Sequence, residues 1–419
     1  LLSRWPRFVF AKHFNMGSSH YAYTECLSDS QYPGDYQFVP GAALCVLEMD
    51  GLYGKVHDLL SDPGGVIRNP DVSWDGERIL FAWKKALHED DYHLYEMDLS
   101  TGNIRQLTFG LGYADYEGVY LPNGDILFNS TRCVQTVDCW WTEVSNLYTC
   151  DKDGRYMRRL TFDQVHTNFP TVMQDGRILY TRWDYNDRGQ LFPQGLFQMF
   201  PDGTAQAEFY GNNSWFPTTL IHARDIPDST LMVAIATGHH TYQAGQLVLV
   251  DPAMGRQENS GVQLVAPIRE TKAVRIDHYG QHGALFQYPW PINDREFVLS
   301  YHPLGYEGQT GGKVNRNGHV EGVNRAILPR FALYWMDIDA NRELLAADPE
   351  TSCNQPVPLD ARMPPPVRPS EVDYGKETGT YYIQDIYTGP GLDGVERGTV
   401  KRLRVIALEY RAAGIGQNR

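Results

Sequence analysis

The sequence predicts an all-β fold, a β-propeller of six four-stranded antiparallel blades, and two observations lead to this class. The first is a hairpin signature at Asp175-Gly176, a dipeptide that accepts positive φ and precedes the β-prone run Ile178-Leu179-Tyr180. The second is recurrence, because equivalent runs begin at residues 79, 126 and 178. Spacings of 47 and 52 residues are close to the period of about 40–50 residues that propeller repeats show.

Each of the three clearest repeats contains further strand-like segments after its hairpin. A run that begins with Leu and an aromatic residue follows, and in two repeats a polar glycine turn then leads to a segment ending in Leu-Thr. The expected third strands are Leu94–Asp98, Leu147–Asp151 and Leu196–Phe200, and the expected fourth strands are Ile104–Thr108 and Met157–Thr161. Four short antiparallel strands per repeat make one propeller blade.

Weaker copies extend the series to six blades. Second strands are expected at Phe8–Phe10, Val233–Ile235 and Phe297–Leu299, and third strands at Leu44–Asp50, Leu247–Asp251 and Leu333–Asp337. The first strand of five repeats carries an early proline, which suits the start of a strand, where no ladder donor is lost. These prolines are Pro70, Pro170, Pro217, Pro289 and Pro356.

The N-terminal blade begins at its second strand, and the sequence around Pro356 resembles a first strand. We therefore expect residues near Pro356 to complete the N-terminal blade and close the ring. This places the propeller at residues 1–362. The run Met363–Pro366 predicts a linker, and residues 363–419 then carry two more strand-like segments, Thr380–Tyr387 and Val400–Tyr410. Two strands are too few for a core, so they are expected to pack on the propeller, to serve in docking or assembly, or to begin a further domain.

Composition excludes two classes of partner. The net charge of −14 and the lack of a basic stripe argue against nucleic acid, which is bound through clustered Lys and Arg. No apolar run approaches the length of a membrane span. The chain starts at Leu1 without Met or a signal peptide, which indicates a processed or partial chain.

The six cysteines leave two interpretations open. Cys133 with Cys139, and Cys26 with Cys45, are close enough in sequence for disulfides in an oxidising compartment, whereas Cys45, Cys150 and Cys353 could equally be buried free thiols. Asn129 and Asn212 begin glycosylation sequons. These features favour an extracytoplasmic protein, periplasmic or secreted.

Candidate site residues gather where the second strands end and where blades are linked, because in a propeller these segments open on one face. Cations, imidazoles and a thiol are expected there, at one end of the channel. The channel-mouth residues that could bind a ligand or partner are Arg132, Arg182, Asp184, His166, His278 and His302, and the candidate metal ligands are Cys133, His239, His240 and His282.

Both sets have alternative interpretations. Imidazole and thiolate suit zinc or iron, yet adjacent histidines in a strand point to opposite faces, so at most one of His239 and His240 should face the channel. Arg132 and Arg182 could clamp a carboxylate or phosphate, or join neighbouring blades through buried hydrogen bonds. The segment Asp184–Gly189 resembles a calcium loop but has Arg188 where an oxygen ligand belongs.

The repeat pattern resembles TolB-type propellers, and a more specific resemblance covers about residues 5–410. It is carried by Ser130–Cys133, Leu179–Tyr185, Asp202–Thr204 with Tyr210–Asn212, and Gly283–Pro289. These segments resemble the propeller domain of the hydrazine synthase alpha subunit family. The resemblance implies a propeller beside haem-bearing domains, with a loop cysteine at a metal-containing site; that cysteine would correspond to Cys133. The haem-attachment sequence Cys-x-x-Cys-His is absent, so no covalent haem is expected within these residues.

Three functions are consistent with these observations. The leading hypothesis is an extracytoplasmic binding and assembly module whose loop-rich face receives a protein partner, a metal or another subunit. The enzyme alternative is redox or hydrolytic chemistry at a divalent metal (zinc, iron or calcium) held by Cys133 and nearby histidines. The third is a structural subunit of an extracellular polymer, joined through exposed blade edges or Thr380–Tyr410.

Overall fold

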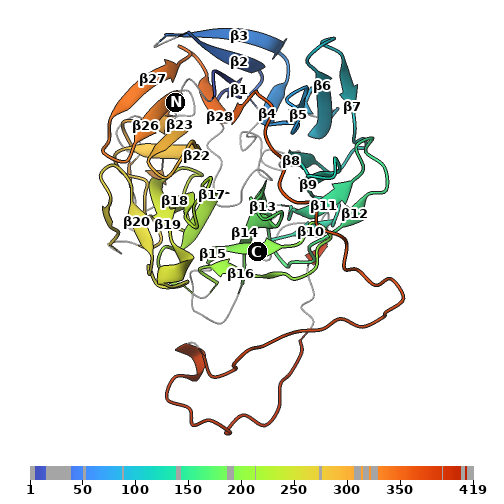
Figure 1. Cartoon of the computed structure of the whole chain (residues 1–419), viewed down its shortest axis with the longest axis vertical. Coiled ribbons are helices and arrows are strands. Elements are labelled where there is room, and N and C mark those ends of the chain that lie inside the picture. The colour runs from blue at the N-terminus through green and yellow to red at the C-terminus, as the bar shows by residue number, and fades with distance from the viewer. Residues whose placement is uncertain are drawn as a thin grey trace.

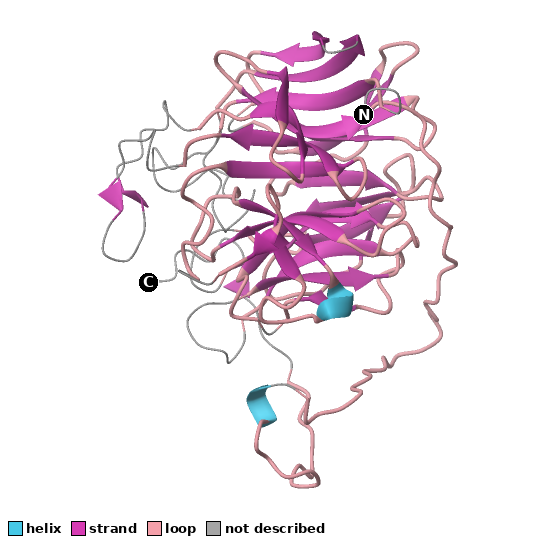
Figure 2. Ribbon diagram, turned by 60° about the vertical axis from the view of Figure 1, so that its left-hand side comes forward, coloured by secondary structure: helices cyan, strands magenta, loops and turns pink. Residues whose placement is uncertain are grey.

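A computed structural model of the chain describes residues 5–15, 39–50, 53–86, 89–137, 143–185, 193–212, 214–272, 276–305, 313–314, 320–321, 329–388, 390–406 and 411–412. Antiparallel sheets surround a central channel, and the C-terminal segment leaves them as a long excursion (Figure 1). Figure 2 shows the two short 3-10 helices, η2 (Pro252–Met254) and η4 (Pro390–Leu392). The propeller arrangement predicted from the repeats is confirmed.

Four sheets have four strands each, in the described part of the chain. They are β28 (Ser352–Pro358), β1 (Arg7–His13), β2 (Ala42–Asp50) and β3 (Tyr53–Asp62); β4 (Val66–Val72), β5 (Arg78–Lys84), β6 (His93–Asp98) and β7 (Ile104–Gln106); β8 (Asp115–Tyr120), β9 (Ile126–Ser130), β11 (Asn146–Cys150) and β12 (Arg158–Arg159); and β22 (Leu285–Pro291), β23 (Glu296–His302), β26 (Ala332–Asp337) and β27 (Arg342–Ala346). Every pairing within these sheets is antiparallel.

A fifth sheet has nine strands, which corrects the expectation of six separate four-stranded sheets. It contains β13 (Thr167–Val172), β14 (Ile178–Trp183), β15 (Gln194–Met199), β16 (Ala207–Tyr210), β17 (Thr219–Asp225), β18 (Met232–Thr237), β19 (Gln246–Val250), β20 (Val262–Leu264) and β21 (Arg269–Glu270). The physical reason is one parallel contact, Gln194 in β15 opposite Thr219 in β17, which joins two antiparallel runs. Two small pairs lie apart, β10 (Gln135–Thr136) with β29 (Arg411–Ala412) and β24 (Lys313–Val314) with β25 (Val320–Glu321).

The predicted hairpins form at the Asp-Gly and Asn-Gly turns. Gly76, Gly124 and Gly176 all have positive φ, and each donates its backbone N–H to the carbonyl three residues earlier at 2.8–2.9 Å. Positive φ is the conformation that glycine adopts without steric cost, so these dipeptides set the hairpin register. The second and third strands expected in the weaker repeats also lie within observed strands, except that Asp251 falls one residue beyond β19.

The strand containing Pro356 pairs with the N-terminal strand, as its sequence predicted. In β28, Val357 lies opposite Val9, and Cys353 lies opposite Lys12. Val357 and Leu359 then pack in one buried apolar cluster and Cys353 in another. β28 and β1 are therefore neighbours in one sheet, although 338 residues separate them along the chain.

Six strands line the channel and contact one another in cyclic order: β28, β4, β8, β13, β17 and β22. Each has one residue with φ between 46° and 61°, at a point where the ladder register shifts. Such a β-bulge redirects a side chain and leaves a backbone donor outside the ladder. We call these residues the channel ring: Asn69, Glu117, Phe169, His222, Tyr288 and Gln355.

The bulges correct the predicted role of the prolines. Pro70, Pro170, Pro289 and Pro356 directly follow a channel-ring residue and so lie inside their strands, where the bulge removes the need for a donor. Pro217 is different, because it precedes β17 and its peptide bond is cis, and Ala223 occupies the position after the ring residue.

The segment after β28 crosses the end of the channel where the Asp-Gly turns lie, and we call residues 361–371 the strap. Arg362 donates its backbone N–H to Trp74 O at 2.8 Å, and Arg368 Nε donates to Asp175 O at 2.8 Å. Farther on, the backbone N–H of Glu371 donates to Asp202 Oδ2 at 2.6 Å. The predicted linker is thus fastened to three separate turns.

The expected β extension is largely absent from the described part of the tail. Residues 380–388 and 400–406 contain no strand, and most of their side chains are exposed; residues 407–410 lie outside the described residues. The described strand of the tail is β29, which pairs with β10. Figure 1 shows residues 372–406 looping away from the sheets.

Removing β28 should destabilise the whole propeller, whereas removing the tail beyond the strap should not. A chain ending at residue 350 exposes the edge of β1 and removes Cys353, Val357 and Leu359 from two buried clusters. We expect a loss of several kcal/mol in unfolding free energy, roughly 25 cal/mol for each Å² of apolar area re-exposed, measured by thermal and urea denaturation. The matched control is a chain ending at residue 371, and equal stability of the two would contradict this role for β28.

Candidate functional site

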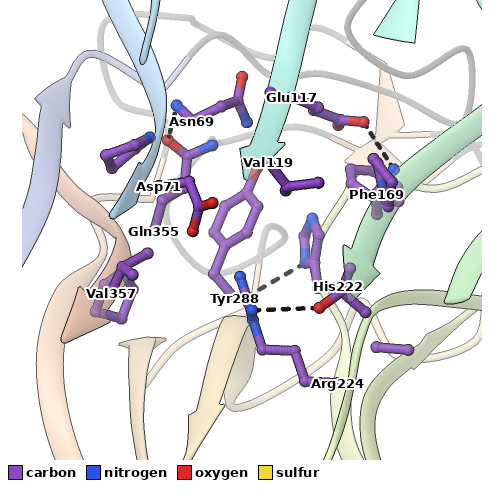
Figure 3. Close-up of a pocket in the computed structure, with 16 residues that line it drawn as sticks. Asn69, Asp71, Glu117, Val119, Phe169, His222, Arg224, Tyr288, Gln355 and Val357 are labelled. Carbon is purple, nitrogen blue, oxygen red and sulfur yellow. Dashed lines mark hydrogen bonds between the residues drawn. The ribbon is translucent and has the colours of Figure 1, made fainter. Parts of the chain in front are cut away.

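The channel ring surrounds a cavity of about 80 Å³ at the centre of the propeller (Figure 3). All six ring residues line it, together with the residues that follow them in five of the six strands. We call it the channel cavity. Its position follows from the bulges, because each one turns a side chain toward the channel axis.

Alternate ring side chains accept backbone hydrogen bonds from the next strand round. Gln355 Oε1 accepts from the Asn69 N–H at 2.7 Å, and Glu117 Oε2 accepts from the Phe169 N–H at 2.7 Å. His222 Nδ1 accepts from the Tyr288 N–H at 3.3 Å. The donors released by the bulges are thus satisfied by neighbouring side chains, which fixes those side chains in place.

The ring has an aromatic half and a polar half. The ring centroids of Phe169 and His222 lie 4.5 Å apart, and those of His222 and Tyr288 lie 3.8 Å apart. Gln355, Asn69 and Glu117 come from the adjacent strands β28, β4 and β8. A planar ligand could contact the aromatic faces while its edge met the polar groups.

Four buried polar atoms of the ring have no hydrogen-bond partner among the described residues: Asn69 Oδ1, Glu117 Oε1, His222 Nε2 and Gln355 Nε2. Because His222 Nδ1 accepts from Tyr288, its Nε2 carries the proton and is a donor. Gln355 Nε2 is also a donor, and Asn69 Oδ1 is an acceptor. Unpaired buried groups of this kind cost about 1–3 kcal/mol each, so they mark a place where a ligand or water would be stabilised.

Burial controls the charge of the two titratable ring residues. Burial raises the pKa of Glu117 to about 7, against the lowering effect of hydrogen bonds from Phe169 and Asn129 and of the charge on Arg68. Burial, with the charges on Arg224 and Arg68, lowers the pKa of His222 well below its ordinary value. The imidazole is therefore neutral at pH 7, and Glu117 exchanges its proton near neutrality.

Three residues predicted at the strand exits come together around one indole. Trp183 is buried, with the His166 ring 5.6 Å and the His239 ring 5.4 Å from it. Cys133 packs against the same apolar cluster, and its thiol donates to Val144 O at 3.1 Å. Burial raises the pKa of the Cys133 thiol to about 11 and lowers that of His166 to about 3. These residues share an apolar pocket that Trp183 occupies.

A carboxylate joins two other predicted histidines. Asp277 Oδ1 lies 2.7 Å from His240 Nδ1, and Asp277 Oδ2 lies 3.2 Å from His278 Nε2. Burial tends to raise the pKa of Asp277, but hydrogen bonds from both histidines outweigh it and hold the pKa well below the ordinary range. Sequence reasoning named both histidines as site residues and gave no role to Asp277, which directly precedes His278.

The predicted arginines are each bound to carboxylates of the chain. Arg132 donates from Nε and Nη2 to the two oxygens of Asp115, at 2.9 and 2.7 Å. Arg182 Nε lies 2.8 Å from Asp184 Oδ1 and 3.0 Å from Asp163 Oδ1. Arg132, which follows β9, thus pairs with a residue of β8, the adjacent strand in the same sheet, and Asp184 is a partner of Arg182; ligand binding by these arginines stays a prediction.

The remaining predicted residues are separate from these groups. His302 Nδ1 lies 2.8 Å from Arg330 O, and His282 is exposed. Cys45 and Cys133 are free thiols, while Cys26 and Cys139, their suggested disulfide partners, lie outside the described residues.

The two sequons differ in exposure. Asn129 is fully buried and its amide donates to Glu117, an arrangement that does not favour glycosylation at this position. Asn212 is exposed and stays a prediction.

The channel ring itself was not predicted. Its residues differ in chemistry, so no motif links them, and its position depends on bulges that break the alternation of side chains along a strand. The available signal was the proline that follows four of the six ring residues.

Comparison with known proteins finds similarity in structure. No protein-family model and no curated protein matches the chain. Hydrazine synthase from Kuenenia stuttgartiensis superposes with a TM-score of 0.61 at 16% identity, over 86% of this chain and 48% of that one. TolB from Acinetobacter baumannii gives a TM-score of 0.49 at 15% identity, over 84% of this chain and 66% of that one.

The shared feature is the propeller fold. At these identities the similarity concerns the fold alone, and the chain spans about half the length of the hydrazine synthase chain. Among the described residues, no cluster of three or more His, Cys, Asp or Glu side chains could hold a metal ion. The described residues also include no helix long and apolar enough to cross a membrane.

Glu117→Gln should remove a pH dependence of stability. A carboxyl whose pKa rises on folding from 4.5 to about 7 stabilises the fold fully below pH 4.5, and this contribution is lost as pH rises through 7. The wild type should therefore lose about 2 kcal/mol between pH 5 and 8 relative to Glu117→Gln, measured by urea denaturation at each pH. Glu343→Gln, at an exposed site, is the control, and parallel pH profiles for all three proteins would contradict the assignment.

Proposed function

We propose that the chain is a ligand-binding propeller module in which six blades form a ring. In this proposal the nine-stranded sheet is two blades joined by the Gln194–Thr219 contact, and β28 completes the blade of β1. The cyclic contacts of the six channel strands support it. A ring holds the channel residues at fixed mutual positions, as a binding site requires.

The ligand of the channel cavity is a small neutral planar group, such as an amide or a protonated carboxyl. The observation that carries this proposal is the set of four buried ring atoms without partners, two of them donors and at least one an acceptor. An amide offers both a carbonyl and N–H groups in one plane, and its face would contact Phe169, His222 and Tyr288. A bare cation does not fit, because His222 Nε2 and Gln355 Nε2 present protons.

Binding of acetamide, followed by saturation-transfer NMR and by density in soaked crystals, tests this function. We expect saturable binding to the wild type and binding at least about fivefold weaker to Gln355→Met, which loses the buried donor. Gln263→Met is the control, because Gln263 is exposed. No saturable binding to the wild type, or equal binding to both variants, would rule out the channel as the site.

Assembly is a second candidate function, and the exposed tail supports it. Tyr381 and Tyr382 are each 86% exposed and Val405 is 82% exposed, far from any packed core. Exposed aromatic and aliphatic side chains on an extended segment are suited to burial against a partner or another copy of the chain. An extracytoplasmic location belongs to the same proposal and has its support in the exposed sequon at Asn212.

The chain ending at residue 371 tests assembly, because it keeps the strap and lacks the exposed tail. If the tail joins copies, light scattering should give a larger particle for the full chain than for the shortened one at equal concentration. Identical masses, each that of one chain, would exclude self-assembly through the tail.

The enzyme alternative keeps its prediction of a metal at Cys133. The protonated thiol and the indole beside it do not favour this function. Stoichiometric metal that is lost in Cys133→Ala, measured by elemental analysis, would restore it.

A further inference from the structure

A second cavity, of about 550 Å³, lies between the channel and the strap. We call it the strap cavity. It shares Asp71, Val119, Thr171 and Arg224 with the channel cavity, so the two adjoin. Met363 and the three prolines Pro364–Pro366 line its outer side. Prolines have no N–H donor and hold an extended conformation, so they give this side a stiff apolar surface.

Two guanidinium groups enter the strap cavity from different elements. Arg224 comes from β17 and Arg362 from the strap, and their Cζ atoms lie 4.3 and 5.2 Å from the centroid of the Trp290 ring. Arg362 is held by donation from Nη2 to Val72 O at 2.6 Å and lies 4.9 Å from the Trp74 ring. Both cations are thus positioned before any ligand arrives.

One carboxylate, Asp71, lies within ion-pair distance of these two cations in the described part of the chain, and its ion-pair partner is Arg362. Arg224 has no carboxylate within ion-pair distance there; its Nη1 lies 3.4 Å from Thr171 Oγ1. The nearest acid to Arg362 is Asp71, at 3.7 Å, and Asp71 also accepts from the Tyr120 N–H at 2.9 Å. Arg362 Nε is buried and has no hydrogen-bond partner among the described residues. Two largely buried cations with a single carboxylate near them leave an excess of positive charge, so a further anion is favoured there.

The other two acidic residues that line the strap cavity are Asp225 and Asp228. Asp225 Oδ2 accepts from the Gln174 N–H at 2.6 Å, and burial raises the pKa of Asp225. Asp228 is exposed at the outer edge. Burial lowers the pKa of Arg224 to about 10, with the charge on Arg362 adding to the effect, so both guanidinium groups are charged at pH 7.

We propose that the strap cavity binds an organic carboxylate with an apolar or aromatic body, its carboxylate held by Arg224 and Arg362. Guanidinium pairs match a planar carboxylate through parallel N–H donors. The body would lie among Trp5, Trp74 and the strap prolines, which line the same cavity. The volume is within the range of about 300–1,000 Å³ that holds small organic ligands. This proposal does not rest on the ligand proposed for the channel cavity.

The test is calorimetric titration of the full chain with 3-phenylpropionate, with its neutral amide and with inorganic phosphate. We expect the acid to bind at least about tenfold more tightly than the amide and than phosphate. No binding of the acid up to about 10 mM, or equal affinity for acid and amide, would overturn the proposal. Tighter binding of phosphate would overturn the assigned ligand class.

Two substitutions in the strap distinguish a role of Arg362 in binding from a general effect of removing an arginine from the strap. Arg362→Gln should weaken binding of the acid at least about tenfold, and Arg368→Gln, on the same strap but bound to Asp175, should leave it unchanged. Equal binding by the wild type and Arg362→Gln would overturn the proposal. Should Arg362→Gln fail to fold by circular dichroism, Arg224→Lys gives the same test, because it keeps the charge and loses the paired donors. Binding of acetamide in the channel cavity should persist in Arg362→Gln, which separates this inference from the proposed function.

Discussion

The central site depends on one backbone constraint, which is that each channel strand contains a residue with positive φ. A non-glycine residue with positive φ costs of order 1–3 kcal/mol and persists only where its surroundings hold it. Here the surroundings are the bulge and the hydrogen bonds that alternate ring side chains accept, such as the one from the Asn69 N–H to Gln355 Oε1. Because backbone geometry sets the ring, its side chains are free to differ in chemistry, and a polar half faces an aromatic half.

The two cavities differ in charge although they share a wall. In the channel cavity, burial suppresses charge, so that His222 is neutral and Glu117 has a pKa of about 7. In the strap cavity, Arg224 and Arg362 keep their charge because guanidinium groups resist deprotonation. The charge of Arg224, with that of Arg68, also disfavours protonation of His222, which lies two residues before Arg224. The neutral ring and the cationic cavity are thus electrostatically coupled.

The repeat could be read from the sequence because hairpin turns and strand alternation are local properties. The pairing of β28 with β1 also followed, since the N-terminal repeat lacked one strand. Residues that depend on tertiary geometry could not be predicted. His166, His239 and Cys133 do lie together, but they surround Trp183. The burial of Trp183 cannot be inferred from the spacing of residues in the sequence. The ring was missed because the prolines were assigned to strand starts, and Pro217 precedes its strand while Ala223 follows the ring residue.

The strap cavity depends on the pairing of β28 with β1, because the strap follows β28 directly. Arg362 follows the last residue of β28 by four positions, and Leu359 still donates its N–H to Arg7 O at 2.9 Å. The guanidinium of Arg362 can therefore reach Trp74 and Trp290 only after β28 has paired with β1. Its partner Arg224 lies on β17, more than a hundred residues away in sequence. Formation of the cationic site therefore depends on the pairing of β28 with β1, so an occupied strap cavity would stabilise that pairing.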